Sequence, residues 1–284
     1  MTAPSAAGSD HRFFVGLSRA FGGAVFFSLP LLMTMEMWQL GHYLPRGRVA
    51  LFILLILPIL IVLDRFSGFM HTDSWAEDAV DGIIAFGVGA VAATFVLFVL
   101  DIIEPGMPVR EIVGKVALQA VPGGFGAVLA NSQFSADRGD DDGNRGGNGA
   151  HDQPGSYTAE VFFMLVGAVF LAFNVAPTEE IVLLAVRMGP VHLVVMLLVT
   201  LAMMHAFVFA SGFRGSPQHG PDEKGWGLFL RFTVVGYAVA LLVSAWVLWT
   251  FGRFTHMPPA DVVAHMVVLA LPAGLGAAAA RLIL

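Results

Sequence analysis

Residues 23–36 read GAVFFSLPLLMTME, and residues 167–180 read GAVFLAFNVAPTEE. The two stretches lie 144 positions apart, about half of the 284-residue chain, and share their first four residues, a later threonine and a final glutamate. Ser67-Gly68-Phe69 recurs at the same offset as Ser211-Gly212-Phe213, and the Pro122–Gly126 motif recurs at an offset of 150 as Pro272–Gly276. Repeated motifs at nearly one offset indicate a duplicated structural unit.

The composition of the chain indicates a membrane protein. Of its residues, 57% are hydrophobic and 13% are charged, and its mean hydropathy is +0.77, whereas a soluble domain carries about 25% charged residues. The net charge of −6 argues against a nucleic-acid partner, and the lack of cysteine excludes disulfides and thiolate metal sites. The first dozen residues lack the apolar core and cleavage site of a signal peptide, so we expect Phe13 onward to be a retained first span.

Eight apolar stretches are long enough to cross the hydrocarbon of a lipid bilayer, which needs roughly 20 residues each. They lie near 14–37, 48–69, 81–103, 110–130, 158–177, 190–213, 226–251 and 261–283. The fourth is the least apolar, because Glu111, Lys115, Gln119 and several glycines interrupt it. Its counterpart, the eighth, is more apolar and supports the assignment. The sequence therefore predicts an all-α membrane protein with about eight transmembrane helices.

Each half of the chain holds four of these spans. Because an even number of crossings returns the chain to its starting side, we expect two parallel four-helix repeats and not inverted ones. The first repeat is residues 1–131 and the second is residues 158–284. Residues 132–157 between them are rich in Gly, Asp and Asn and are expected to be a flexible polar linker. The Lys and Arg residues divide nine to six between the two sides, which favours a cytoplasmic N-terminus in the cell inner membrane.

The candidate functional residues lie near the end of the first span of each half. Each of these spans contains a proline in its later part, Pro30 or Pro177, followed by a threonine and carboxylates. Proline leaves a backbone carbonyl without its usual partner, which a membrane tolerates only where protein or water satisfies it. Threonine hydroxyls and freed carbonyls are neutral oxygen ligands, and carboxylates add the negative charge that attracts a cation. The candidate cation-binding residues are Glu36, Glu179, Glu180, Thr34, Thr178 and the mid-span Asn174.

The position of these acids along the helix suggests their role. Glu36 lies more than twenty residues after Phe14, which is about 33 Å of helix. We therefore expect Glu36 and its counterparts in the second half at the outer boundary of the membrane, as a paired acidic mouth. The alternative is that Pro177 and Thr178 begin a new short helix, whose N-terminus the following glutamates stabilise.

The stretches Pro30-Leu-Leu-Met-Thr-Met-Glu-Met-Trp38 and Phe173-Asn-Val-Ala-Pro-Thr-Glu-Glu180 resemble a small family of uncharacterised bacterial integral membrane proteins, catalogued as a domain of unknown function. This resemblance would cover nearly the whole chain, and it implies no particular activity. Separately, Arg19-Ala-Phe-Gly-Gly-Ala-Val-Phe26 is faintly similar to the first helix of potassium channels that carry an Arg-x-x-Phe-Ser-Asp motif. Here Gly22-Gly23 replaces Ser-Asp, and those channels have six spans per repeat instead of four.

These residues lead us to expect a membrane transport protein for an inorganic cation, either a channel or a secondary transporter, with its acidic mouth formed by the first helix of each repeat. A homodimer would gather four such helices, and no cofactor is expected. The chain shows no nucleophile elbow, phosphate loop or zinc-binding His-Glu-x-x-His motif, so we expect no enzymatic activity. The alternative is a non-transporting scaffold or an accessory subunit of a membrane complex. A lipid-acting enzyme would have only His205 or the loop around His71 for its chemistry.

Overall fold

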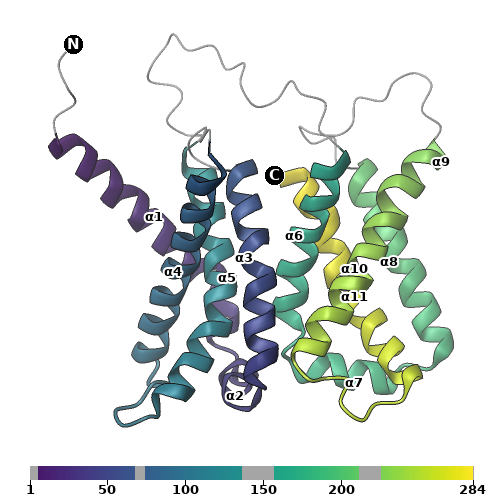
Figure 1. The fold of residues 1–284 in the computed structure, drawn as a ribbon. Helices are drawn as coiled ribbons and strands as arrows, with labels where there is room; N and C mark the ends of the chain where they lie inside the picture. Colours follow the sequence, from purple (N-terminus) through teal and green to yellow (C-terminus); the bar gives the residue numbers. More distant parts are fainter. Residues whose placement is uncertain (1–5, 68–73, 136–156, 211–224, 284) are drawn as a thin grey trace. The chain divides into compact units, whose positions relative to one another are not determined.

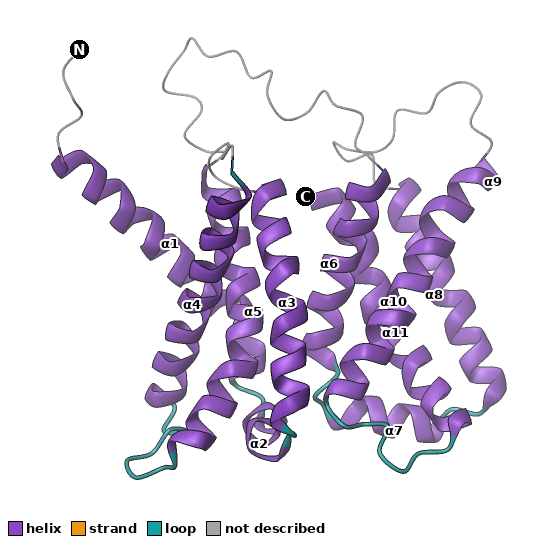
Figure 2. Ribbon diagram, viewed as in Figure 1, coloured by secondary structure: helices purple, strands orange, loops and turns teal. Residues whose placement is uncertain are grey.

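The computed structural model describes residues 6–67, 74–135, 157–210 and 225–283. All regular structure within these ranges is helical (Figure 2), as the sequence predicts. Eight helices in the described ranges are long and apolar enough to span a membrane. Most of the expected linker 132–157 lies outside the described ranges, and so does most of the Ser67–Phe69 and Ser211–Phe213 pair.

The long helices follow the predicted spans closely, with ends that differ by a few residues (Figure 1). They are α1 (Ala6–Leu32), α3 (Arg46–Ser67), α4 (Trp75–Val99), α5 (Val109–Ser135), α6 (Tyr157–Val175), α8 (Pro190–Ala210), the run of α9 (Gly225–Leu228), the π-helical η2 (Phe229–Val234) and α10 (Val235–Thr250), and α11 (Pro259–Ile283). Two short helices, α2 (Met35–Tyr43) and α7 (Glu179–Arg187), follow α1 and α6.

The chain divides into two compact units, Met1–Gly146 (unit 1) and Gly147–Leu284 (unit 2). In unit 1, α5 is the central helix and packs against α1, α2, α3 and α4. In unit 2, α11 has the same place and packs against α6, α7, α8 and α10. In the apolar window of each central helix, 67% of the residues of α5 and 61% of those of α11 are buried. Because α5 is surrounded by protein on most sides, its polar residues can avoid contact with lipid. This explains why the fourth span is the least apolar.

Each central helix crosses the first helix of its unit at paired glycines. A Cβ on Gly23 would collide with the carbonyl oxygen of Gly126 and with Ala130. A Cβ on Gly167 would collide in the same way with the carbonyl oxygen of Gly276. The second pair lies 144 and 150 positions after the first, which are the two offsets of the sequence repeat. Close backbone approach of this kind holds helices together in lipid, where the hydrophobic drive between them is absent.

The connections that lead into the two central helices also correspond. Between α4 and α5, the backbone has positive φ at Asp101 (59°) and at Gly106 (92°). Between α10 and α11, it has positive φ at Gly252 (74°) and at His256 (60°). Glycine adopts this left-handed conformation freely, whereas other residues do so at a cost. The two connections therefore have left-handed residues at corresponding places. The glycine is the second of the two in unit 1 (Gly106) and the first of the two in unit 2 (Gly252).

The first long helix of each unit ends sooner than the sequence predicts. The predicted spans run to residues 37 and 177, but α1 ends at Leu32 and α6 ends at Val175. Thr34 and Thr178 are the N-cap residues of α2 and α7, which are nine residues long and 144 positions apart. Glutamates occupy the first turn of each short helix, where the helix dipole favours negative charge. In unit 2, a new short helix therefore begins after Pro177, as the alternative interpretation of the sequence predicts. Unit 1 has the same break between its first two helices.

Candidate functional site

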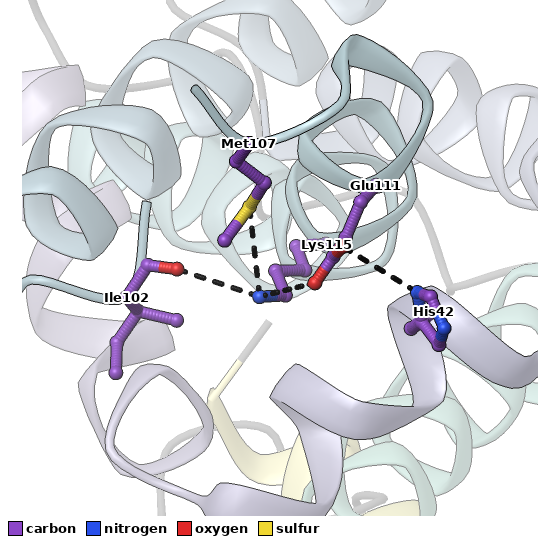
Figure 3. Close-up of polar contacts among 5 residues, drawn as sticks. All are labelled: His42, Ile102, Met107, Glu111 and Lys115. Carbon is purple, nitrogen blue, oxygen red and sulfur yellow. Dashed lines mark hydrogen bonds and ion pairs between the residues drawn. The ribbon is translucent and has the colours of Figure 1, made fainter. Parts of the chain in front are cut away.

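A charged cluster lies at the start of the central helix of unit 1 (Figure 3). The ammonium of Lys115 is 2.9 Å from Oε1 of Glu111, one turn earlier on α5. It also lies 3.4 Å from the carbonyl oxygen of Ile102 and 3.7 Å from the sulfur of Met107. Oε2 of Glu111 is 3.6 Å from Nδ1 of His42 on α2. We call these five residues the Lys115 cluster.

The Lys115 cluster leads from the end of the helix bundle into the membrane span. Side-chain exposure falls from 54% at His42 to 23% at Glu111 and 10% at Lys115. His42 lies outside the apolar spans, whereas Glu111 and Lys115 belong to the span Val109–Ala130. Ionisable groups inside a span are rare and are functional hypotheses by default.

Close packing holds the neighbouring elements against the start of α5. A Cβ on Gly41 of α2 would be 2.6 Å from Cα of Lys115, and a Cβ on Gly114 would collide with the carbonyl oxygen of Gly41. The α4–α5 connection, which has left-handed residues at Asp101 and Gly106, places the Ile102 carbonyl and the Met107 sulfur beside Lys115. The cluster is therefore built from three elements whose backbones are fixed by small residues and tight turns.

Gln119 lies one turn beyond Lys115 on α5 and is fully buried. Neither its amide nitrogen nor its amide oxygen has a hydrogen-bond partner in the part of the chain that the structure describes. An unpaired amide is costly inside a membrane, because no bulk water replaces the lost bonds. Glu111, Lys115 and Gln119 are spaced by four residues, so they share one face of α5. Together they form a polar track that ends at a fully buried amide.

Unit 2 carries a shorter version of this track on α11. Asp261, His265 and Leu269 lie 150 positions after Glu111, Lys115 and Gln119. His265 is 1% exposed, and its Nδ1 is 2.7 Å from the carbonyl oxygen of Asp261. Because a carbonyl only accepts, Nδ1 carries the proton of the neutral ring and Nε2 is left as an acceptor. This Nε2 is buried and has no partner among the described residues.

The predicted neutral ligands bond to their own chain segments. Oγ1 of Thr34 donates to the carbonyl oxygen of Pro30 at 2.6 Å. Oγ1 of Thr178 donates to the carbonyl three residues before it at 2.9 Å, and Nδ2 of Asn174 donates to the carbonyl four residues before it at 2.7 Å. These bonds use the donors and leave oxygen lone pairs available, so a role of these residues as cation ligands stays a prediction.

The predicted acids have different surroundings. Glu36 is half-buried in the first turn of α2, and Glu180 is exposed in the first turn of α7. The hydrogen bond from its own backbone N–H lowers the pKa of Glu180. Glu179 is 3.0 Å from Nη1 of Arg253, whose Nη2 donates to the carbonyl oxygen of Pro177. Arg253 therefore ties the break after α6 to the α10–α11 connection. The acidic mouth combines residues of both units and stays a prediction.

The sequence profile of one protein family, described as "Putative integral membrane protein (DUF2391)", matches residues 16–284. The chain belongs to this family. Membership confirms the resemblance shown by the Pro30–Trp38 and Phe173–Glu180 stretches, and it identifies the chain as an integral membrane protein in contact with lipid. No curated protein and no solved structure matched the chain.

In this DUF2391 protein the Lys115 cluster is not among the residues that sequence reasoning selects. From the sequence alone, Glu111, Lys115 and Gln119 are recognised only as polar residues that make the fourth span less apolar. A signal for them exists, because an acid and a base four residues apart recur as Asp261 and His265 at the offset that relates Pro122 to Pro272. The other members of the cluster, such as the carbonyl of Ile102, have no sequence signal at all.

Proposed function

We propose that this integral membrane protein transports protons, as a channel or as a proton-coupled carrier, through unit 1 along the polar track of α5. The observation that carries the proposal is the graded burial of the track. The series runs from exposed His42 through partly buried Glu111 to largely buried Lys115. It ends at the fully buried Gln119, whose amide has no hydrogen-bond partner among the described residues. Such a series is what a proton needs to enter a membrane span in steps.

The Glu111–Lys115 pair supplies a protonation-dependent element. While Glu111 is ionised, its carboxylate holds the Lys115 ammonium at 2.9 Å. A proton on Glu111 neutralises the carboxylate and removes that attraction, so that the ammonium keeps only the Ile102 carbonyl and the Met107 sulfur as partners. Protonation therefore breaks the ion pair within α5 and removes the charge that Glu111 presents to His42 of α2, which is a physical route from proton binding to a conformational change.

The proton fits this site better than a metal cation. The Lys115 ammonium already neutralises Glu111, so a metal ion would have to displace a positive charge from its carboxylate. A proton needs no such space, because it adds to the carboxylate directly. His42 lies on the outer side of Glu111, and its side chain is 54% exposed, so its imidazole can exchange protons with water.

The predicted acidic mouth has a supporting role in this proposal. Glu36 lies in the same short helix as His42, and its negative charge raises the local concentration of cations near that end of unit 1. Glu179 and Glu180 would do the same for unit 2, and Thr34, Thr178 and Asn174 would add neutral oxygens. Because such steering depends on unscreened charge, it weakens as salt rises.

Proton flux into liposomes tests the proposal. The purified protein is reconstituted around a pH-sensitive dye, and a potassium diffusion potential drives protons inward. We expect the wild-type protein to carry protons, and we expect Glu111→Gln to carry them about tenfold more slowly or worse. A tenfold change in rate corresponds to about 1.4 kcal/mol in the activation free energy of proton transfer. Glu104→Gln is the matched control, because it removes an exposed acid from the same α4–α5 connection without touching the track. Glu36→Gln should lower flux only at low salt.

Two results would overturn the proposal. Flux in Glu111→Gln equal to that of the wild type would remove the track from the pathway. An absence of flux in the wild type, at several pH values and under both signs of potential, would instead support the scaffold or accessory subunit that the sequence leaves as an alternative.

A further inference from the structure

A second feature of unit 1 is a cleft of about 760 Å³ between the first turns of α3 and α5. Its mouth is basic, because Arg46 of α3 and Arg110 of α5 both line it, together with His42 of α2. Glu111 also reaches the cleft, but its charge is neutralised by Lys115. The net charge at the mouth is therefore positive.

The two arginines at this mouth have no negatively charged partner among the residues that the structure describes. Both side chains are exposed, and neither makes an ion pair within the described ranges. Arg46 and Arg110 lie in the first turns of α3 and α5. A helix N-terminus favours negative charge and disfavours cations, so the helices themselves do not explain this placement. An anion from outside the protein would satisfy both guanidinium groups.

The floor of the same cleft is apolar. Val49 and Ile53 lie one turn apart on α3, and Val113 and Ala117 lie one turn apart on α5. Both strips lead away from the arginines into the membrane spans Arg46–Phe66 and Val109–Ala130. A free phosphate would use only the mouth, whereas a molecule with a negative head and a hydrocarbon chain would use the mouth and the floor together.

We propose that this cleft binds one anionic phospholipid, with its phosphate between Arg46 and Arg110 and an acyl chain along the floor. Guanidinium groups are suited to phosphate because their N–H donors match its oxygens in pairs. Two of them at one mouth favour a head group with net negative charge over a zwitterionic one. His42 and Glu111 of the polar track also line this cleft. The inference does not depend on proton transport, because it rests on Arg46, Arg110 and the apolar floor, which have no part in the proposed track.

Unit 2 lacks the basic part of this arrangement. The positions that correspond to Arg46 and Arg110 hold Pro190 and Ala260. The apolar strips persist there, since Val263 and Val267 correspond to Val113 and Ala117. We therefore expect the lipid site in unit 1 only. Unit 2, which has the same fold without the two arginines, provides the comparison.

Native mass spectrometry and thermal unfolding of the detergent-purified protein test the site. Added phosphatidylglycerol should give one retained lipid and raise the Tm, whereas phosphatidylcholine and inorganic phosphate should do neither. The double variant Arg46→Gln with Arg110→Gln should lose the retained lipid and the rise in Tm. Arg187→Gln is the matched control, because it removes an exposed arginine from the end of α7 in unit 2.

A second variant tests the site without altering its charge, in case the loss of the two arginines weakens folding. Ala117→Phe fills the floor without altering charge, and it should reduce phosphatidylglycerol retention at least tenfold. The proposal is overturned if the double variant still prefers phosphatidylglycerol, or if inorganic phosphate alone gives the full rise in Tm. It is also overturned if the double variant loses a dimer peak and not a lipid adduct, because the cleft would then bind a second copy of the chain.

Discussion

Units 1 and 2 agree in backbone and differ in their buried polar side chains. The central helices α5 and α11 cross the first helices of their units at glycines in corresponding positions, Gly126 and Gly276. The same helices carry different polar residues one turn inside the membrane. Unit 1 has Lys115 paired with an acid, and unit 2 has His265, whose Nε2 has no hydrogen-bond partner among the described residues. The glycines are required by any chain that adopts this crossing. The polar residues are not required by the crossing, and they are where the two units differ.

The largest expected effect concerns the shared crossing. Gly23→Ala places a methyl group against Ala130 and the Gly126 carbonyl, so we expect a loss of about 3 kcal/mol in unfolding free energy. Gly22→Ala is the adjacent control, because a Cβ there meets nothing within 4 Å, and it should stabilise α1 by up to about 1 kcal/mol. Gly167→Ala should reproduce the loss in unit 2. Thermal unfolding followed by circular dichroism measures all three, and a neutral Gly167→Ala would break the correspondence between the units.

The next effect concerns the polar residues that differ between the units. Lys115→Met leaves the partly buried Glu111 carboxylate without its ammonium, so we expect a loss of about 2 kcal/mol. Adding Glu111→Gln should recover most of that loss, because the uncompensated charge is gone. His265→Met should cost about 1 kcal/mol, since it removes one hydrogen bond and no charge pair. Equal losses for Lys115→Met alone and for the double variant would show that the charge pair contributes nothing.

A smaller effect concerns the break after the first helix, which the two units secure differently. In unit 1, Nε1 of Trp38 donates to the carbonyl oxygen of Leu32 at 2.7 Å. In unit 2, Arg253 reaches the Pro177 carbonyl and Glu179. Trp38→Phe removes one hydrogen bond, and we expect it to cost about 1 kcal/mol. Arg253→Gln removes the bond to the Pro177 carbonyl and the ion pair with exposed Glu179, and because the ion pair contributes little, we expect a similar cost of about 1 kcal/mol. Glu179→Gln should cost less, because exposed ion pairs contribute little. Chemical unfolding of the three variants compares them, and a larger cost for Glu179→Gln than for Arg253→Gln would contradict this order.

The smallest effect is a pH dependence confined to unit 2. The hydrogen bond from its own backbone N–H lowers the pKa of Glu180 in the folded protein. Its ionised form therefore stabilises the fold above the ordinary glutamate pKa, and this contribution is lost as the pH falls through the lowered value. We expect Glu180→Gln to lower the Tm slightly at neutral pH and to leave it unchanged in strong acid. A difference that grows toward acid pH would have the wrong sign for this account.

Much of the fold follows from the sequence, because hydropathy alone reports whether a segment can cross lipid. All eight spans are found in this way, and the family assignment agrees with the membrane class. The ends of α1 and α6 are harder, since Pro30 and Pro177 permit either a continued span or a new helix.

The candidate site depends on information that is not local in sequence. Glu111 and Lys115 are visible as an acid–base pair four residues apart, and their repeat in unit 2 strengthens the signal. Their partners His42 and the Ile102 carbonyl come from other elements, which only the packing of α2 and the α4–α5 connection against α5 brings near. The unpaired state of the Gln119 amide is likewise a property of the packed unit.

Proton flux in liposomes, compared between Glu111→Gln and Asp261→Asn, tests the central claim most directly. These two variants remove the acid at the same place in α5 and in α11, so they differ only in the unit that is changed. We predict that Glu111→Gln lowers the flux at least tenfold and that Asp261→Asn retains the wild-type rate. Equal rates in the two variants would contradict the assignment of the proton track to unit 1.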